Sequence, residues 1–270
     1  MPLRLTPTFR DALAGADRPL AGMWVCTGSP LVAEICAGAG LDWVLIDMEH
    51  SPNGLESVLA QLQAVAPYPV TPVVRVPIGD VVTIKQVLDL GAQNLLVPMV
   101  SSRADAEAVV AAVRYPPRGT RGVGSALARS ARWNRVDGYL QDGDAHVSLF
   151  VQIETMAGVE AAAAIAAVDG VDGVFVGPSD LAASMGALGQ QTHPDVVAAA
   201  LRAFDAVRAA GKPVGVNAFD PAAADAYVEA GAGFVLVGAD VALLARGSEA
   251  LAARFVRTDR TAPSGERTSY

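Results

Sequence analysis

The sequence predicts an α/β fold, a single (β/α)8 TIM barrel, and three observations favour it. Short apolar runs such as Trp43–Met48 and Gly173–Val176 alternate with stretches of helical periodicity such as Leu55–Val65. The runs are continuously apolar, as expected for parallel strands that are buried on both faces. The length of 270 residues suits one barrel, which typically needs ~250.

Eight strands and their intervening helices are predicted in strict alternation. The strands are Gly22–Cys26, Trp43–Met48, Val73–Val76, Asn94–Val100, Val147–Ile153, Gly173–Val176, Val214–Asn217 and Phe234–Val237. The helices are a short leading one within residues 1–17, then Pro30–Ala39, Leu55–Val65, Asp80–Leu90, Ala104–Arg114, Val159–Ala167, Val196–Ala210, Ala222–Ala230 and Val241–Phe255. Helix and strand thus alternate up to residue 256, which predicts one barrel domain over residues 1–256.

Two segments lack this rhythm. Residues 115–135 are rich in Gly, Pro and Arg and predict a long loop, and the polar residues 257–270 predict a disordered tail. A doubly wound open sheet is the alternative fold. That fold usually has a Gly-rich phosphate turn after its first strand, which the letters CTGSP at this point do not match.

Composition excludes several classes of partner. The net charge is −8 and the pI is about 4.8, which argues against binding to nucleic acid or to an anionic membrane. No apolar run approaches the ~20 residues that span a bilayer, and no secretory leader is evident, so a cytoplasmic protein is expected. Cys26 and Cys36 are too few for a disulfide framework and are expected to be reduced and structural.

Polar residues gather at the carboxyl ends of the predicted strands, where barrels of this kind build their active sites. They are Asp47, Glu49, His50, Arg75, Gln152, Glu154, Ser179, Asp180, Asn217 and Asp240. Among the three histidines, His50 is the one that leaves a strand at this end, whereas His146 precedes a strand and His193 precedes a helix. His50 is therefore the candidate general base, with a hydrogen bond to a loop as its alternative role.

Arg75 is expensive to bury in a strand otherwise made of Val and Pro. It either forms a salt bridge with Asp47 or Glu49, or it stabilises an enolate oxygen.

The turn Gly177–Leu181 offers backbone N–H groups that would receive a substrate carboxylate. The basic run of the long loop, expected mainly to be a solvated face or a subunit contact and with anion recognition as the alternative, comprises Arg118, Arg121, Arg129, Arg132 and Arg135.

Glu154 and Asp180 are the candidate metal ligands, because they leave adjacent strands at the same depth and can converge. Two carboxylates with waters and substrate oxygens suit Mg²⁺ or Mn²⁺. The alternatives are a helix N-cap for Asp180 and a salt bridge to an arginine for Glu154. The two lysines, Lys85 and Lys212, lie in a helix and before a strand, so no Schiff-base lysine is expected and a metal would be the electrophile.

Several motifs in the same order resemble the HpcH/HpaI family of class II aldolases, from about Pro19 to Phe255. They are LIDMEHSPN, PVVRVP, IKQVLDLGAQNLLVPMV, RYPPRGTRGVGSALARSARWN, VQIET, GVDGVFVGPSDL and LLARGSEALAARF. The resemblance implies a barrel of the phosphoenolpyruvate/pyruvate-domain type and reversible cleavage of 4-hydroxy-2-oxoacids to pyruvate and an aldehyde. It also implies a divalent metal cation (Mg²⁺, Mn²⁺ or Co²⁺) and a hexamer that exchanges its C-terminal helix between subunits.

By this resemblance, roles fall on particular residues. Glu154 and Asp180 match the metal ligands, His50 the base and Arg75 the enolate-stabilising residue; Gln152, Ser179 and Asp180 match the substrate contacts.

Asp89 matches an aspartate that raises the basicity of the histidine, and Asp47 is a second candidate for that support. Asn217 and Ser179 replace an apolar residue and an alanine of similar sequences, which affects the preferred aldehyde. The alternatives are a CoA-ester lyase of the citrate lyase β-subunit type and a non-catalytic barrel that binds an organic acid.

Overall fold

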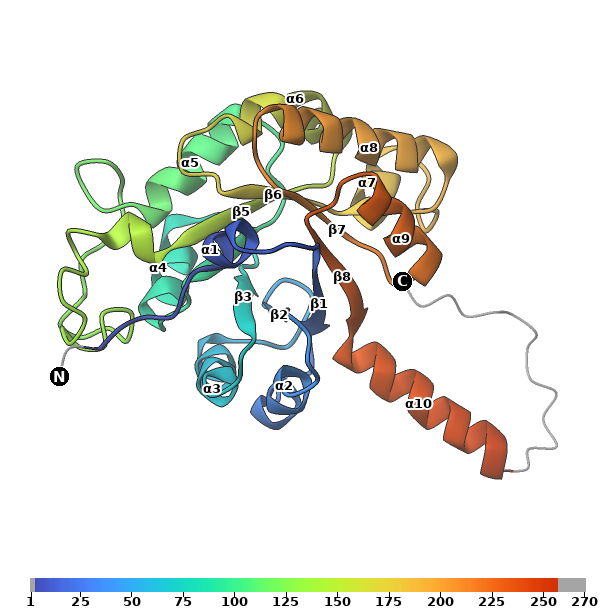
Figure 1. Cartoon of the computed structure of the whole chain (residues 1–270), viewed down its shortest axis with the longest axis horizontal. Coiled ribbons are helices and arrows are strands. Elements are labelled where there is room, and N and C mark those ends of the chain that lie inside the picture. The colour runs from blue at the N-terminus through green and yellow to red at the C-terminus, as the bar shows by residue number, and fades with distance from the viewer. Residues whose placement is uncertain (1–2, 257–270) are drawn as a thin grey trace.

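A computed structural model describes residues 3–256, and in this range eight parallel strands close a barrel in sequence order (Figure 1). The strands are β1 Leu20–Val25, β2 Trp43–Asp47, β3 Thr71–Arg75, β4 Asn94–Val97, β5 Ser148–Ile153, β6 Gly173–Val176, β7 Val214–Asn217 and β8 Phe234–Ala239. Pairing of Leu20 in β1 with Phe234 in β8 closes the ring. The predicted barrel is confirmed; the predicted tail lies outside the described residues.

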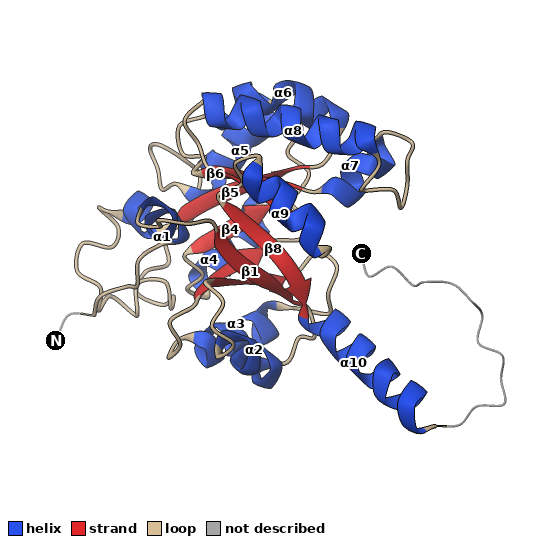
Figure 2. Ribbon diagram, turned by 45° about the vertical axis from the view of Figure 1, so that its right-hand side comes forward, coloured by secondary structure: helices blue, strands red, loops and turns tan. Residues whose placement is uncertain are grey.

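Helices surround this barrel (Figure 2). They are α1 Phe9–Ala14, α2 Pro30–Ala37, α3 Leu55–Val65, α4 Val81–Asp89, α5 Arg103–Val113, α6 Met156–Ala166, α7 Pro178–Ser184, α8 Pro194–Ala209, α9 Pro221–Glu229 and α10 Asp240–Phe255, with a 3-10 turn, η1, at Gly143–His146. Most predicted bounds agree to within a few residues. Helix α7 was predicted as the turn Gly177–Leu181, because its seven residues are too few to show a period.

Strand alternation sorts the side chains into two layers. Val214 and Val216 of β7 face the helices, whereas Gly215 faces inward, where a side chain would overlap the ring of Phe234. Gly22 of β1 makes the same kind of room for Trp43. The interior is thus filled by large rings, and small residues beside them let the strands close to native packing density.

Helix α1 closes the amino-terminal end of the barrel. Phe9 is 1% exposed, and its ring centroid lies 4.9, 5.1 and 5.4 Å from those of Trp43, Phe150 and Phe234. Its backbone N–H donates to Asn94 Oδ1 at 2.7 Å. A plug at this end leaves the carboxyl ends of the strands as the open mouth.

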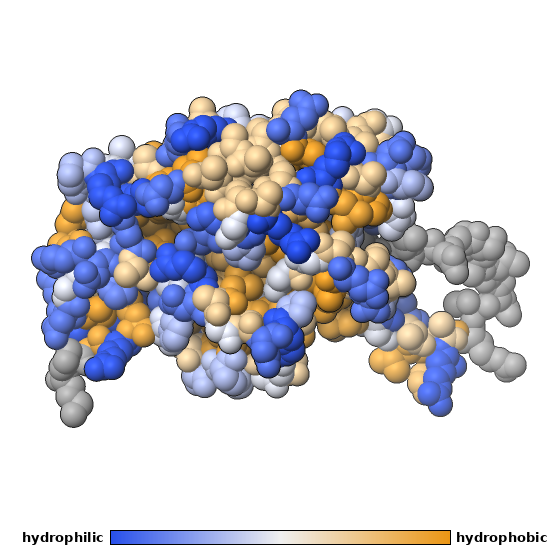
Figure 3. Space-filling view, turned by 45° about the horizontal axis from the view of Figure 1, so that its top comes forward, coloured by the Kyte–Doolittle hydropathy of each residue, from blue (hydrophilic) through white to orange (hydrophobic). Residues whose placement is uncertain are grey.

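Helix α10 differs from the other helices because it projects from the barrel (Figures 1 and 2). Its large apolar side chains are exposed, for example Leu243 at 65%, Leu251 at 62% and Phe255 at 70%. In Figure 3 the projecting helix, at the lower right, carries apolar surface beside hydrophilic surface. None of the described helices is long and apolar enough to cross a membrane.

Replacing the plug tests how the barrel interior is stabilised. Phe9→Ala should lower the free energy of unfolding by about 3–5 kcal/mol, because it removes a ring from a fully buried aromatic cluster. Leu188→Ala, at a position that is 80% exposed, is the matched control and should change it by less than about 0.5 kcal/mol. Urea unfolding measures both; equal midpoints for the two variants would contradict the role of the plug.

Candidate active site

Arg75 is buried at the barrel mouth between two carboxylates. It ends β3 in register with Asp47 of β2. Its Nε lies 2.8 Å from Asp47 Oδ1 and its Nη1 lies 2.8 Å from Glu49 Oε2, with the arginine side chain only 6% exposed. The guanidinium carbon lies 4.3 Å from the ring centroid of Trp24. The salt bridges expected as one role of Arg75 are therefore present, and they hold its guanidinium in one orientation.

Asp47 also fixes the turn that carries His50. Burial opposes ionisation of Asp47, but the hydrogen bond and charge of Arg75 outweigh it and lower the pKa of the carboxyl. The same carboxylate accepts hydrogen bonds from the backbone N–H groups of Glu49, at 3.0 Å, and His50, at 3.2 Å. One buried carboxylate thus orients both the arginine and the backbone of the candidate base.

The His50 imidazole stands at the mouth, with its side chain 66% exposed and its Nε2 3.8 Å from Glu49 Oε2. This position gives it access to a bound molecule and to solvent. The other histidines have structural contacts: His146 stacks on Tyr139, and His193 accepts a hydrogen bond at the start of α8.

Glu154 follows β5 and is 2% exposed. Its Oε1 accepts a 2.7 Å hydrogen bond from the backbone N–H of Met99, and its Oε2 accepts one from the Gln152 side chain. Burial raises the pKa of Glu154 to about 7, and the nearby charges of Glu49 and Asp180 add to this increase. Met99 has a left-handed backbone (φ 59°), a conformation that costs of order 1–3 kcal/mol in a non-glycine residue. The strained backbone of Met99 thus directs its N–H at a buried carboxylate.

These carboxylates suit a hard cation. Glu154 and Asp180 form no ion pair in the described part of the chain, and Arg75 is already paired with Asp47 and Glu49. Over residues 3–256 no group of three or more His, Cys, Asp and Glu has metal-ligand geometry. A cation here would take two carboxylates from the protein and its other ligands from water or a bound oxoacid, as Mg²⁺ commonly does. The donor set therefore fits the group that the sequence predicts.

The start of α7 positions two more candidates. Gly177 is the N-cap, so the alternative that Asp180 caps this helix is wrong; Asp180 is its exposed third residue and Ser179 its half-buried second. Asp180 is close enough to raise the pKa of both Glu49 and Glu154. Asn217 ends β7 and its Oδ1 accepts a 2.7 Å hydrogen bond from the Trp24 indole. Strand ends and α7 therefore bring these side chains to one mouth.

Asp89 lies elsewhere in the chain. It is the last residue of α4, which leads into the amino end of β4, whereas His50 follows the carboxyl end of β2. Its carboxylate lies 3.8 Å from Arg121 Nη2, and burial raises its pKa. Within one chain, Asp89 and His50 are thus at opposite ends of the barrel.

Several arginine side chains of the loop over residues 115–135 are more buried than its basic composition indicates. Arg121 has a fully buried side chain stacked on Tyr115 and Tyr139, with ring centroids 4.6 and 5.9 Å from its guanidinium carbon. Arg129 and Arg132 are half-buried, and each donates to a backbone carbonyl. The expectation of a solvated face or subunit contact is wrong for Arg121, which serves as a core residue of this loop.

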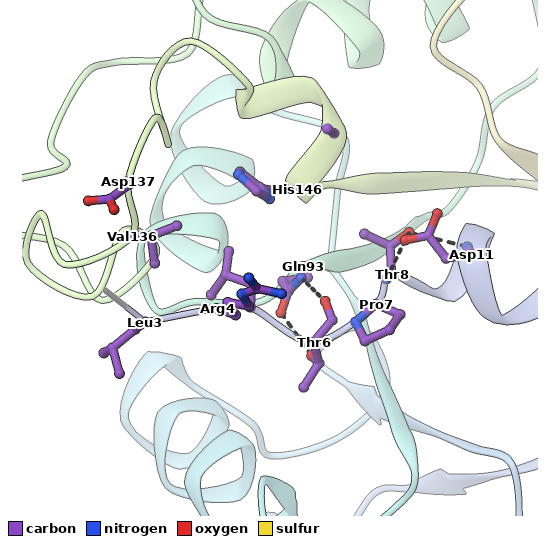
Figure 4. Close-up of a pocket in the computed structure, with 12 residues that line it drawn as sticks. Leu3, Arg4, Thr6, Pro7, Thr8, Asp11, Gln93, Val136, Asp137 and His146 are labelled. Atoms are coloured by element: carbon purple, nitrogen blue, oxygen red, sulfur yellow. Dashed lines mark hydrogen bonds between the residues drawn. The ribbon is translucent and has the colours of Figure 1, made fainter. Parts of the chain in front are cut away.

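The amino-terminal end of the barrel carries other features. Lys212 precedes β7, and its Nζ donates to the backbone oxygen of Val171 at 2.7 Å. A cavity of about 640 Å³ lies between residues 3–8, Gln93 and His146 (Figure 4). Its lining includes none of the carboxyl-end side chains described above. The cavity and the candidate active site are therefore separate.

The sequence did not indicate the part that three residues play at the mouth. Met99 acts through its backbone, so its identity carries no signal. Trp24 was predicted as an ordinary strand residue, although its inward parity near the end of β1 is a signal that could have indicated the site. Asp240, noted only as a strand-end acid, accepts hydrogen bonds from the N–H groups of Cys26 at 2.8 Å and Thr27 at 3.0 Å, and so ties the start of α10 to the loop after β1.

Carboxylates, a histidine and an arginine lie together at the barrel mouth, and comparison with known proteins identifies the class of the chain as a carbon–carbon lyase. The family model described as HpcH/HpaI aldolase/citrate lyase matches residues 20–247. The chain belongs to this family.

Relatives and solved structures agree with the assignment. The curated 4-hydroxy-2-oxo-heptane-1,7-dioate aldolase of Salmonella heidelberg (strain SL476) is 54% identical over 247 residues, which cover 92% of this chain and 94% of the relative. An HpcH/HpaI aldolase/citrate lyase family protein from Burkholderia cenocepacia J2315 is 43% identical with a TM-score of 0.88, over 94% of this chain and 100% of that one. An HpcH/HpaI aldolase from Desulfitobacterium hafniense DCB-2 is 28% identical with a TM-score of 0.85, over 96% and 100%.

The buried ion pair makes stability depend on pH. Asp47→Asn should lower the free energy of unfolding by about 3–5 kcal/mol at neutral pH, because Arg75 loses a buried partner. The folded-state pKa of Asp47 is lowered, so its contribution is present above the ordinary pKa of ~3.9 and is lost as the pH falls below it. The difference between the two proteins should therefore shrink on acidification. Urea unfolding between about pH 7 and about pH 3 measures it, with the exposed Asp137→Asn as control; a constant difference would contradict the ion-pair role.

Proposed function

We propose that the chain catalyses reversible aldol cleavage of a 4-hydroxy-2-oxoacid to pyruvate and an aldehyde. The observation that carries the proposal is the buried Arg75, fixed by two carboxylates, facing the uncompensated carboxylates Glu154 and Asp180 across the same mouth. The name of the 54% identical relatives supports 4-hydroxy-2-oxoheptanedioate as a substrate, which would release succinate semialdehyde.

Glu154 and Asp180 would hold the divalent cation, with Mg²⁺, Mn²⁺ and Co²⁺ as candidates. When bound, the cation supplies Lewis acidity that polarises the 2-oxo carbonyl. Gln152 already orients Glu154 by hydrogen bonding, and Ser179 of α7 lies beside Asp180 at the mouth. These two side chains are the proposed contacts to the oxoacid part of the substrate.

His50 takes the proton from the 4-hydroxyl, directly or through a water. The C3–C4 bond then breaks: C4 leaves as the aldehyde, and the electron pair passes to C3 and the 2-oxo oxygen as the enolate of pyruvate. Arg75 holds that oxygen while its charge develops, which is where a fixed guanidinium stabilises most. A proton delivered to C3 releases pyruvate.

Support for the base comes from two aspartates in different ways. Asp47 orients the turn of His50 through its backbone N–H. Asp89 is at the other end of the barrel, so it can reach a His50 only from a second copy of the chain. The exposed apolar side chains of α10, among them Leu243 and Phe255, also suit contact with another copy. A homo-oligomer, a hexamer by the resemblance, is therefore part of the proposal.

Removing the metal tests the electrophile. Treatment with EDTA should abolish pyruvate release from 4-hydroxy-2-oxoheptanedioate, and added Mn²⁺, Co²⁺ or Mg²⁺ should restore it, because neither Lys85 nor Lys212 is placed to form a Schiff base and the cation is the proposed electrophile. A coupled assay for pyruvate measures the rate. Full activity of the metal-stripped protein would contradict the assignment of a metal as the electrophile.

Replacing His50 tests the base. His50→Ala should lower kcat for cleavage by about 10²–10⁴-fold, the usual contribution of general base catalysis, while pyruvate still binds. Steady-state pyruvate release and inhibition by pyruvate measure the two effects. His193→Ala, at the exposed start of α8, is the matched control. Turnover of His50→Ala at the level of this control would remove His50 from its role.

A further inference from the structure

Asn217 has an orientation that its neighbour dictates. It is the last residue of β7 and shares the inward parity of Gly215, so its side chain faces the barrel interior, where Oδ1 accepts the 2.7 Å hydrogen bond from Trp24 Nε1. An indole N–H can only donate, so the amide must present its oxygen to Trp24. The amide nitrogen, Nδ2, is therefore directed away from Trp24.

Nδ2 is left without a protein partner. No hydrogen bond from it is made within residues 3–256, and Asn217 is half-buried. On the neighbouring strand, Gly238 lies two residues beyond Leu236, the register partner of Asn217. No atom lies within 4 Å of the place where a Cβ of Gly238 would stand. A fixed hydrogen-bond donor on the inward face of β7 is thus unused by the protein, and the adjacent strand has no side chain at Gly238.

The position of this donor relative to the reacting atoms follows from Trp24. The Trp24 ring lies under the Arg75 guanidinium at 4.3 Å, so Asn217 is one side chain removed from the group that holds the 2-oxo oxygen. Glu154 and Asp180 follow β5 and β6, on the other side of Asn217 from β8 and β1. With the pyruvate half of a substrate between Arg75 and these carboxylates, the sector over β7, β8 and β1 remains for the aldehyde half.

We propose that Asn217 is a specificity-determining residue, whose Nδ2 donates a hydrogen bond to an oxygen on the aldehyde part of the substrate. The enzyme then prefers aldehydes that carry such an acceptor, a hydroxyl or a carboxylate, over alkyl aldehydes. This inference rests on the proposed aldol function. A donor that has no protein partner discriminates because an alkyl substrate leaves it unpaired.

The test compares glycolaldehyde with propionaldehyde, which differ by a hydroxyl in place of a methyl group, as acceptors for pyruvate in the aldol direction. The measured quantity is the ratio of their kcat/KM values. Asn217→Leu should lower the glycolaldehyde/propionaldehyde ratio by about 3- to 10-fold, the effect of one lost hydrogen bond. Hydration of either aldehyde in solution is the same for every variant and cancels when ratios are compared.

Asn217→Asp is the matched variant. Its carboxylate still accepts from Trp24 but cannot donate, so it should lower the ratio at least as far as Asn217→Leu. An unchanged ratio in Asn217→Leu overturns the proposal. So does a native ratio in Asn217→Asp beside a lowered one in Asn217→Leu, because that result assigns the effect to the placement of Trp24.

Two further measurements keep these outcomes separate from other failures. Circular dichroism and thermal unfolding identify a variant that does not fold, and Trp24→Phe then serves as a second probe: it frees the amide to rotate and should lower the ratio while keeping a ring under Arg75. Absence of aldol product and of methyl-proton exchange of pyruvate in D₂O, for the unmodified protein with Mn²⁺ present, would refute the proposed function rather than the role of Asn217.

Discussion

The burial of one guanidinium constrains the whole barrel mouth. A cation at 6% exposure is tolerated only if carboxylates are held at bonding distance, and Asp47 and Glu49 meet that need from the adjacent strand end. Asp47 then has little freedom left, since its oxygens are also committed to the turn that carries His50. The electrostatic need of Arg75 thus determines where the imidazole stands, and a ring beneath the guanidinium completes its enclosure.

Across the mouth the charge balance is reversed. Glu154 is buried with hydrogen-bond donors but no cation, and burial with the neighbouring acids raises its pKa to about 7. The left-handed Met99 shows that the fold tolerates strain to keep a donor on this carboxylate. One side of the mouth is therefore neutralised by the chain itself, and the other keeps the carboxylates that would hold the proposed cation. In the proposed reaction, the oxygens of a bound oxoacid would lie between the Arg75 side of the mouth and the carboxylates on the other side.

Much of this was predictable from sequence because two simple signals repeat. Continuous apolar strands and periodic helices indicate the barrel, and barrel topology alone sends the last residues of β2, β3 and β7, and those that follow β5, to a common end. This is why the sequence alone groups Asp47, Arg75 and Glu154 at one end of the barrel. The salt bridges of Arg75 were one of the two roles expected of it, for the physical reason that a lone buried arginine is unstable.

The remaining features depend on contacts that leave no pattern in one dimension. The Met99 N–H has no side-chain signature, and the bond between Trp24 and Asn217 joins residues 193 positions apart. Arg121 lies in a loop without periodicity, so its burial between Tyr115 and Tyr139 could not be read from composition. The separation of Asp89 from His50 follows from direction: a helix that starts at the mouth ends at the opposite face.

The hydrogen bonds of Asp240 join two parts of the molecule that otherwise have different tasks. Asp240 is the first residue of the projecting helix α10, and its carboxylate anchors the backbone immediately after β1, two residues beyond Trp24. In the proposed homo-oligomer, a subunit that contacts α10 would therefore act on the same short segment that supports the ring beneath Arg75. Asp240 thus links the outside of the barrel to the segment beside its mouth, so in the proposed homo-oligomer subunit contacts on α10 would act close to the site without crossing the hydrophobic core.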